Sequence, residues 1–331
     1  VIAVAAGGPG LAQCGSTDVV LATRLAEGNW SFQVPATDSS HCCPVRDTCT
    51  PPGLDCCEDP NCTVAGPGDV GAWSAIALAQ NGTLGVAFTD QHNYWDDDGQ
   101  NHQGLEFWEG GTITGIRPWS GLGLYAALEY AGNKPIVAFT GYKQNGLWVL
   151  HRPTTNRDGN DWQPVDMGLS DWSGWKIGER IRLAKAPDGT LGMVFHVKED
   201  RNGRTINNLV YCTSNDGGST WNYPCKEIGY GTNLGAYPSL AYDADSRPYV
   251  AYYYCGADDR CPTASDGLEF AWWDAEKGAH GGWWRFRVHG EASSASGFFT
   301  GIVVDPDTGT PTIAFQHQTR GAAMIAEGYF E

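Results

Sequence analysis

The sequence predicts an all-β protein, a six-bladed β-propeller built mostly of four-stranded antiparallel blades. The main observation is a repeat, in which a short apolar strand and a Gly-, Pro- or Asp-containing turn precede a second strand that ends in an aromatic residue. Five copies are clear, at residues 76–88, 127–139, 181–195, 239–252 and 301–315, and a degenerate sixth opens the chain at 1–12. Units made only of strands, spaced by roughly 50–60 residues, indicate propeller blades, because one blade cannot bury both of its faces alone.

Further strands complete each unit. A third strand is expected in every unit, at 18–25, 104–109, 146–152, 207–213, 267–274 and 322–330. A fourth follows in five units, at 29–34, 112–117, 161–167, 221–228 and 283–289. These strands place the blades of a single domain at 1–36, 72–118, 122–168, 178–229, 236–290 and 298–331. Because the last unit shows no fourth strand, either the ring closes with a three-stranded blade or the natural polypeptide continues past Glu331 as part of a longer protein.

Composition limits the possible partners. The 331 residues are 41% hydrophobic and include fourteen Trp, which is enough for a packed core. A net charge of −17 argues against nucleic acid, because phosphate binding depends on clustered Lys and Arg. The charge fits either solubility or an affinity for cations such as Ca²⁺. No apolar run approaches the ~20 residues that a membrane span needs.

Eleven Cys residues predict disulfide bonds and therefore an oxidising compartment, extracellular or periplasmic. Cys212 and Cys225 flank a predicted hairpin, and Cys255 and Cys261 flank a short loop, so we expect each couple to pair. The other seven are Cys14, Cys42, Cys43, Cys49, Cys56, Cys57 and Cys62, most of them in an insertion at 37–68 between the first two blades. Because seven is odd, one thiol is free, bonded to another chain or paired outside this segment. Disulfides fit the insertion better than a zinc site, which would need clear Cys-x-x-Cys pairs or a His pair.

One hairpin carries a recognisable motif. Ser214-Asn-Asp-Gly-Gly-Ser-Thr-Trp221 matches Ser-x-Asp-x-Gly-x-Thr-Trp, the Asp-box. In this respect the chain resembles the Asp-box propellers, which include sialidases, related glycosidases and lyases, and non-enzymatic binders of sugars or proteins. Asp216 is expected to accept hydrogen bonds from backbone N–H groups of the turn, and Trp221 to pack under the next blade. Within that superfamily the motif lies away from the active site, so it predicts the fold and not the function.

The resemblance does not extend to sialidase activity. A sialidase would need an arginine triad for the substrate carboxylate, an acidic general acid/base and a Tyr–Glu nucleophile pair. Only Arg180 and Arg182 lie near the start of an inner strand, and no Arg-Ile-Pro sequence is present. We expect the alternation of side chains to point these two arginines to opposite faces. The sequence therefore predicts a sialidase-like fold in a protein that is not a sialidase.

The long, variable loops all open at one end of the predicted ring, which we call the mouth. They follow the second and fourth strands of the blades, whereas the opposite end carries short turns and the Asp-box. Function is expected among the long loops. Side chains at the ends of the second strands surround the mouth, and the candidate catalytic residues among them are Asp90, His92, His196, Tyr253 and His317. The alternative is a ring of polar side chains bonded to water.

Aromatic and cationic side chains add a candidate binding surface to the mouth. Indole and phenol rings beside polar groups can stack on the C–H faces of sugar rings. The candidate ligand-binding residues are Trp119, Tyr142, Lys143, Trp172, Trp175, Arg180 and Tyr237. A single Trp can equally be a core residue wedged between blades.

The segment Tyr94–His102 is the best candidate for a cation site. Asp96, Asp97 and Asp98 offer the hard oxygen ligands that suit Ca²⁺, although the spacing is not that of an EF-hand. A solvated acidic turn is the alternative.

Three functions are compatible with these features. The first is a secreted carbohydrate-recognition propeller that binds a glycan or polysaccharide at the mouth. The second is an enzyme on the same face, either a polysaccharide lyase, which needs a base, an acid and a cationic neutraliser, or a glycoside hydrolase, which needs two carboxylates. The third is an adhesive or structural module of a larger extracellular protein. No motif for a nucleotide or quinone cofactor is evident.

Overall fold

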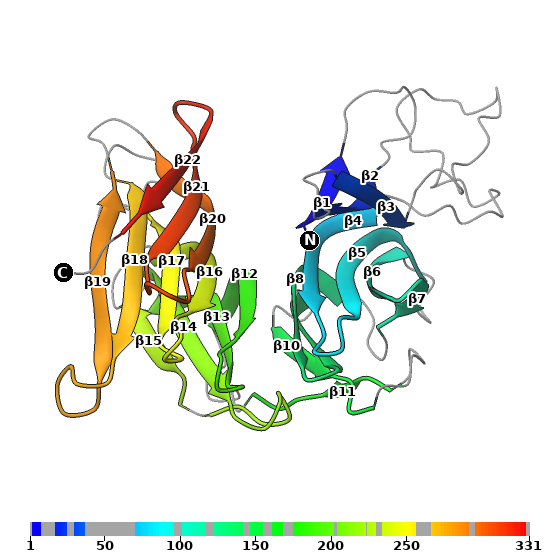
Figure 1. Cartoon of the computed structure of the whole chain (residues 1–331), viewed down its shortest axis with the longest axis horizontal. Helices are drawn as coiled ribbons and strands as arrows, with labels where there is room; N and C mark the ends of the chain where they lie inside the picture. Colours follow the sequence, from blue (N-terminus) through cyan, green and yellow to red (C-terminus); the bar gives the residue numbers. More distant parts are fainter. Residues whose placement is uncertain are drawn as a thin grey trace.

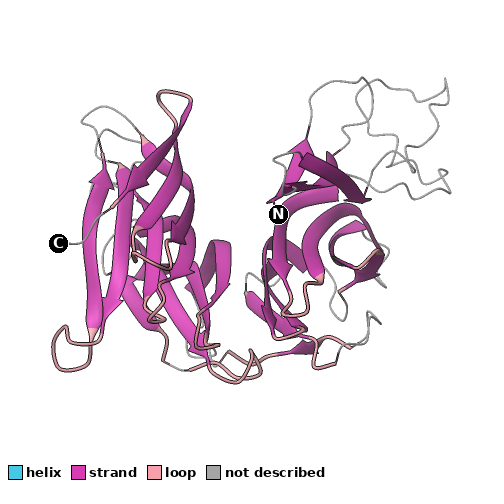
Figure 2. Ribbon diagram, in the orientation of Figure 1, coloured by secondary structure: helices cyan, strands magenta, loops and turns pink. Residues whose placement is uncertain are grey.

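The computed structural model of the chain describes residues 2–7, 17–24, 30–36, 70–95, 101–116, 122–141, 146–154, 161–167, 175–201, 204–222, 224–229, 234–255, 266–290 and 295–328. This part folds into twenty-two β-strands in six antiparallel sheets (Figures 1 and 2). Within it, no helix is long and apolar enough to cross a membrane. The prediction of an all-β fold is confirmed.

Each sheet consists of strands that follow one another in the sequence. Sheet 1 contains β1 (Ile2–Gly7), β2 (Thr17–Arg24) and β3 (Trp30–Ala36). Sheet 2 contains β4 (Val70–Leu78), β5 (Leu84–Trp95), β6 (Asn101–Glu109) and β7 (Thr112–Gly115). Sheet 3 contains β8 (Leu122–Ala131), β9 (Lys134–Gly141), β10 (Leu147–His151) and β11 (Gln163–Pro164).

The second half of the chain is built in the same way. Sheet 4 contains β12 (Trp175–Lys185), β13 (Leu191–Arg201), β14 (Arg204–Ser214) and β15 (Lys226–Gly229). Sheet 5 contains β16 (Leu234–Tyr242), β17 (Pro248–Tyr254), β18 (Gly267–Asp274) and β19 (Gly282–His289). Sheet 6 contains β20 (Ser296–Val304), β21 (Pro311–His317) and β22 (Ala322–Glu327).

The sheets are arranged as blades around a common axis. The first strands of sheets 2 to 6 contact one another in sequence order, β4 with β8, β8 with β12, β12 with β16 and β16 with β20. These first strands are therefore the innermost strands, and the later strands of each sheet lie progressively farther out. Figure 1 shows the blades of the C-terminal half packed side by side, with β12, β16 and β20 facing the N-terminal half.

Sheet 1 departs from the expected strand order. The degenerate repeat predicts an inner strand at the start of the chain, but β1 pairs directly with β2. In the described chain β1 is the first of three strands in its sheet, and both β1 and β2 contact β4 of sheet 2. The rest of that copy, residues 8–12, lies outside the described residues. Sheet 6 has three strands in the described chain, in line with a last repeat that shows no fourth strand.

The hydrophobic core is divided among the seams between neighbouring blades. Phe107 of sheet 2 packs with Phe139 of sheet 3, and Phe195 of sheet 4 also faces sheet 3. Tyr252 of sheet 5 packs in the seam with sheet 4, and Phe315 of sheet 6 in the seam with sheet 5. Four of these five are the aromatic residues that end the repeat, so the repeat predicts core positions because each blade buries the same strand position.

Short turns join the first and second strands at the end opposite the mouth. Asn81 and Asp188 accept hydrogen bonds from the backbone N–H groups of Thr83 (2.9 Å) and Thr190 (2.8 Å), as Asx turns do. Glycines Gly82 and Gly189 have φ of 84° and 91°, which L side chains rarely adopt. Both turns agree with the Gly-, Pro- or Asp-containing turn that the repeat predicts between its two strands.

The Ser214–Trp221 turn has the hydrogen bonds that its sequence predicts. Asp216 accepts from the backbone N–H (2.9 Å) and the hydroxyl (2.6 Å) of Thr220. Partial burial raises the pKa of Asp216, but the hydrogen bonds from Thr220, Ser214 and Ser219 outweigh it and lower the pKa below its usual value. Trp221 packs in the seam with sheet 3 and not under the next blade, so that expectation is wrong. The turn closes on the face of its sheet that points to the preceding blade.

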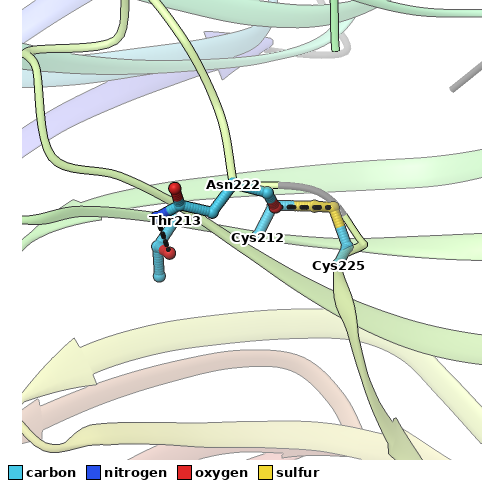
Figure 3. Close-up of a disulfide and its surroundings, with 4 residues drawn as sticks. All are labelled: Cys212, Thr213, Asn222 and Cys225. Carbon is cyan, nitrogen blue, oxygen red and sulfur yellow. Dashed lines mark hydrogen bonds between the residues drawn. A yellow bond between two sulfur atoms is a disulfide. The ribbon is translucent and has the colours of Figure 1, made fainter. Parts of the chain in front are cut away.

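A disulfide joins Cys212 at the end of β14 to Cys225 just before β15, as predicted. Figure 3 shows the bond beside the hydrogen bond from the Asn222 amide to the Thr213 hydroxyl (2.9 Å). Cys255 is also disulfide-bonded. Its predicted partner Cys261 and the insertion 37–68 lie outside the described residues.

Candidate functional site

Backbone bulges shape the centre of the ring. In sheets 2 to 6 the ladder between first and second strand is interrupted at an equivalent point of the first strand, between Ala72 and Ala75, Leu124 and Ala127, Ile177 and Ile181, Ala236 and Ser239, and Phe298 and Gly301. All of these ladders except that of sheet 4 show a second shift just before it. A β-bulge leaves the extra residues unpaired and re-aims their side chains. The bulges occur at equivalent positions, so they direct side chains from different blades to the same axial region.

The bulges hold non-glycine residues in a strained conformation. Tyr125, Arg180, Tyr237 and Phe299 have φ of 57°, 84°, 55° and 51°. These residues occupy equivalent positions in their blades. In each blade, the residue two positions later pairs with the residue just before the aromatic end of the repeat. Tyr237, for example, precedes Ser239 by two residues, and Ser239 pairs with Ala251. Positive φ in Tyr, Arg or Phe costs of order 1–3 kcal/mol and is characteristic of binding and catalytic sites. Four such residues at equivalent positions of four blades indicate a functional centre.

These residues line a cavity of about 180 Å³, which we call the axial pocket. Its walls include Ser74, Tyr125, Arg180, Arg182, Tyr237 and Phe299. Each residue belongs to an innermost strand, and together they come from β4, β8, β12, β16 and β20. Pockets for drug-sized ligands usually measure about 300–1,000 Å³, so the axial pocket suits one small group, such as a single sugar ring.

Two guanidinium groups give the axial pocket its charge. The Cζ atom of Arg180 lies 3.2 Å from the ring centroid of Tyr237 and 4.7 Å from that of Phe299, so two rings hold this side chain in place. Arg182 donates to the carbonyl of Ile181 (2.9 Å). Desolvation and the neighbouring charge of Arg180 lower the pKa of Arg182, although an arginine stays protonated at neutral pH. Two like charges that share a pocket favour an anion between them.

Tyr237 is supported by an aromatic cluster behind it. Its ring meets those of Phe298 (5.3 Å) and Tyr253 (6.2 Å) edge to face. Tyr253 is itself buried and donates its hydroxyl proton to Asp266. Burial, together with the hydrogen bond to Asp266 and its charge, raises the pKa of Tyr253 well above the usual value. Tyr253 therefore stays a neutral phenol, and its ring orients that of Tyr237.

Hydrogen bonds between blades fix the bulge of Tyr237. The Thr300 hydroxyl lies within hydrogen-bond distance of the Tyr237 carbonyl and 3.1 Å from the Ala251 carbonyl. It also lies 3.0 Å from the Ser239 hydroxyl. All three contacts join β20 to sheet 5, so the strained backbone is held by the neighbouring blade.

The two described histidine side chains among the catalytic candidates are buried in different seams. His196 follows Phe195 on β13 and shares a face with Val194, which packs in the seam between sheets 4 and 5. His317 lies between sheets 5 and 6, where its ring is 5.5 Å from that of His289 and its Nδ1 accepts from the Arg320 N–H (3.2 Å). Neither lines the axial pocket. The structure therefore does not bring these two together.

The other candidates divide between the pocket and the part that the structure does not describe. Arg180 and Tyr237 line the axial pocket, and Tyr253 stands behind it. Asp90 and His92 are on β5 and Trp175 begins β12, but their side chains are outside the described set. Trp119, Tyr142, Lys143, Trp172, Asp96, Asp97 and Asp98 lie outside the described residues. Among those described, no group of three His, Cys, Asp or Glu side chains could hold a metal ion.

The expectation that Arg180 and Arg182 point to opposite faces is wrong, because both line the axial pocket. Residues two apart on a strand share a face, and the bulge beside Arg180 brings both toward the axis. Sequence reasoning also missed Tyr125 and Phe299 as site residues. The signal available was their position, two residues before the repeat resumes in each blade. That the protein is not a sialidase stays a prediction.

Comparison with known proteins finds similarity in structure. No protein-family model and no curated protein sequence matches the chain. The GH93 α-L-arabinofuranosidase of Fusarium graminearum, solved with arabinobiose, has a TM-score of 0.52 at 14% identity, over 94% of this chain and 84% of that chain. The Hadza microbial sialidase Hz136 has a TM-score of 0.52 at 12% identity, over 94% of this chain and 59% of that chain. NanB in complex with Optactamide has a TM-score of 0.54 at 11% identity, over 98% and 64%.

At such identities the likeness concerns the fold alone. It agrees with the consecutive antiparallel sheets, the innermost first strands and the core divided among seams. The chain is a six-bladed β-propeller, with an axial pocket lined by the bulged residues of its innermost strands.

Proposed function

We propose that the protein binds carbohydrate at the axial pocket, and that Arg180 and Arg182 recognise a carboxylate or another anionic group on one sugar residue. The observation that carries the proposal is the pairing of two guanidinium groups with Tyr125, Tyr237 and Phe299 around one cavity. Guanidinium groups bind carboxylates with a directional pair of N–H donors. Aromatic faces beside them accept the C–H face of a sugar ring.

Binding explains this set of side chains better than catalysis does. A guanidinium and a phenol with a high pKa do not exchange protons readily near neutral pH, and Tyr253 is both buried and engaged with Asp266. Arg180 is also immobilised between two rings, as a recognition group should be. The lyase or hydrolase alternative depends on Asp90 and His92, which lie on the second strand of sheet 2, β5. The adhesive module is the further alternative.

Secretion is part of the proposal. The Cys212–Cys225 bond and a second bonded cysteine, Cys255, are typical of proteins that fold in an oxidising compartment. We place the protein outside the cell or in the periplasm.

The first prediction tests the axial pocket by titration calorimetry with galacturonic acid, N-acetylneuraminic acid and the neutral sugars galactose and arabinobiose. We expect the wild-type protein to bind at least one acidic sugar and to bind the neutral sugars more weakly. Arg180→Gln and Arg182→Gln should each weaken acidic-sugar binding by about 10- to 100-fold, because a charged hydrogen bond contributes about 1.5–3 kcal/mol.

Arg247→Gln serves as the matched control, since Arg247 is 45% exposed and lies in a turn away from the pocket. Equal binding of acidic and neutral sugars, or wild-type affinity in both pocket variants, would contradict the proposal. An assay for unsaturated products and for loss of viscosity on acidic polysaccharides separates the alternatives. Turnover would favour the enzyme, and failure of all glycans to bind would favour the adhesive module.

A further inference from the structure

A second hollow lies on the outer side of the ring, between the outermost strand β15 of sheet 4 and the β18–β19 hairpin of sheet 5. We call it the rim groove, and its volume is about 950 Å³. The residues that matter here are Lys226, Trp273, Lys277, Trp284 and Arg285. It shares no lining residue with the axial pocket. β15, β18 and β19 are labelled together on the left of Figure 1.

Covalent and steric constraints build the walls of the rim groove. The disulfide fixes Cys225 to β14 and so positions Lys226, the next residue (Figure 3). On the other wall, Gly281 has φ of 75°, and a Cβ atom there would overlap the indole of Trp273. The turn between β18 and β19 can therefore lie directly against this ring only with glycine at that position. Both walls of the rim groove are therefore held in position by specific features of the chain.

Each lysine of the groove lies over the face of an indole. The Nζ atom of Lys226 is 3.6 Å from the centroid of Trp273, and that of Lys277 is 3.9 Å from the centroid of Trp284. Lys277 also donates to the carbonyl of Trp283. Burial lowers the pKa of Lys226 below its usual value. Both ammonium groups are thus held over a ring, and Lys277 also interacts with the charge of Asp274, whose carboxylate accepts from the Trp284 indole N–H (2.8 Å).

The charge of the rim groove is opposite in sign to the net charge of the protein. Lys226, Lys277 and Arg285 line it, and Glu227 is the one carboxylate among the lining residues described. The protein as a whole carries a net charge of −17. A cationic groove on a strongly anionic protein concentrates anionic ligands locally, while the remaining surface repels them.

We propose that the rim groove binds a segment of an anionic polysaccharide. The carboxylate or sulfate groups of such a chain would meet Lys226, Lys277 and Arg285, and the C–H faces of its rings would stack on indole. Trp284 is 44% exposed, which leaves part of its surface open to a ligand. The groove volume is in the range that holds several ring-sized groups. The indole surfaces favour a sugar chain over an acidic peptide, which would need only the charges. This site is independent of the axial pocket and of its proposed role.

The second prediction is tested in the Arg180→Gln background, which removes the axial contribution. Hexagalacturonate is titrated into this protein and binding is followed by calorimetry and Trp fluorescence, with cellohexaose and hexaglutamate as the neutral and the peptidic probes. We expect hexagalacturonate to bind at least tenfold more tightly than either. Adding Lys226→Gln with Lys277→Gln, or adding Trp284→Ala, should lower its affinity at least tenfold, and raising the salt from about 0.05 to 0.5 M should weaken it.

Lys134→Gln is the matched control, because Lys134 is an exposed lysine outside both hollows. Thermal melting of every variant checks that the protein is folded, and the salt dependence of the unmodified groove gives a readout that no folding defect affects. Hexaglutamate binding as tightly as hexagalacturonate would overturn the proposal in favour of an acidic peptide. Unchanged affinity in the double lysine variant, or in Trp284→Ala, would overturn it as well. If Arg180→Gln abolishes binding at the axial pocket while hexagalacturonate still binds, the proposal for the rim groove stands.

Discussion

A buried ion pair crosses the seam between sheets 2 and 3. The Nη2 atom of Arg152 lies 2.7 Å from Oε2 of Glu109, and both side chains are nearly inaccessible to solvent, at 2% and 7% exposure. The Tyr130 hydroxyl donates to the other carboxylate oxygen (2.8 Å), and Arg152 lies over the rings of Phe107 and Trp162. The free energy needed to desolvate two charges is about as large as the free energy gained from their attraction. The pair therefore determines how the two blades align more than it stabilises the fold.

The third prediction follows from this pair. Arg152→Met or Glu109→Gln alone should lower the free energy of unfolding by about 3–5 kcal/mol, because one buried charge loses its partner. The double variant should be more stable than either single one, since no charge stays unpaired. Urea unfolding followed by circular dichroism measures the effect. Arg247→Gln, which removes a partly exposed ion pair, should cost no more than about 1 kcal/mol; a comparable cost for the buried and the exposed variants would refute the argument.

At the scale of a single strand, a glycine near the start of the second strand allows the next blade to approach closely. Gly85 on β5 and Gly192 on β13 hold equivalent places near the start of second strands. A Cβ atom on either would overlap the hydroxyl of a tyrosine that ends the next inner strand, Tyr130 or Tyr242. The Tyr242 hydroxyl lies 2.8 Å from that of Tyr211. A glycine in a strand interior weakens the strand, and here its role is to admit the phenol.

The fourth prediction uses this contact as a double-mutant cycle. Gly192→Ala should destabilise the protein by about 1–3 kcal/mol, as other cases of overpacking do. Tyr242→Phe removes the clashing oxygen, so in that background the cost of Gly192→Ala should be smaller. Denaturant midpoints of the four proteins give the coupling. Strictly additive effects would mean that the alanine and the hydroxyl do not meet.

At the scale of the whole molecule, the seams contain several buried tyrosines. Burial chiefly raises the pKa of Tyr211 to about 12, against the hydrogen bond with Tyr242. Burial and the charge of Asp243 raise the pKa of Tyr249 to about 12 as well. Tyr242 and Tyr252 are raised further, again chiefly by burial. The folded ring therefore holds these groups neutral at pH values where an unfolded chain would ionise them.

The fifth prediction is a loss of stability in alkali. An unfolded tyrosine has a pKa of about 10, so the folded state keeps its full tyrosine contribution below that pH and loses it as the pH rises through about 12. For Tyr211 alone, a shift of about two units corresponds to about 2–3 kcal/mol. Denaturant midpoints measured at increasing pH, together with tyrosinate absorbance, should show ionisation and unfolding as one transition. Full ionisation of the tyrosines in a folded protein would contradict the expectation.

The sequence predicts the molecule at this scale better than it predicts the site. Blade number and the seam residues follow from a repeat, because every blade meets the same packing problem. The axial pocket depends on bulges, which shift register by local geometry and are marked in the sequence only by their position just before the repeat, not by a residue type. His196 and His317 illustrate the difference. Both lie on second strands, but the faces they occupy place them in separate seams.

The strained bulges also bear on how such a ring changes over evolutionary time. Tyr125, Arg180, Tyr237 and Phe299 all have positive φ, although their side chains are a phenol, a guanidinium and a phenyl group. The conformation therefore belongs to the blade and not to the residue. An exchange of side chain at one of these positions alters the chemistry at the axis without rebuilding a loop. Ligand preference can thus diverge by single substitutions, because the same backbone feature recurs from blade to blade.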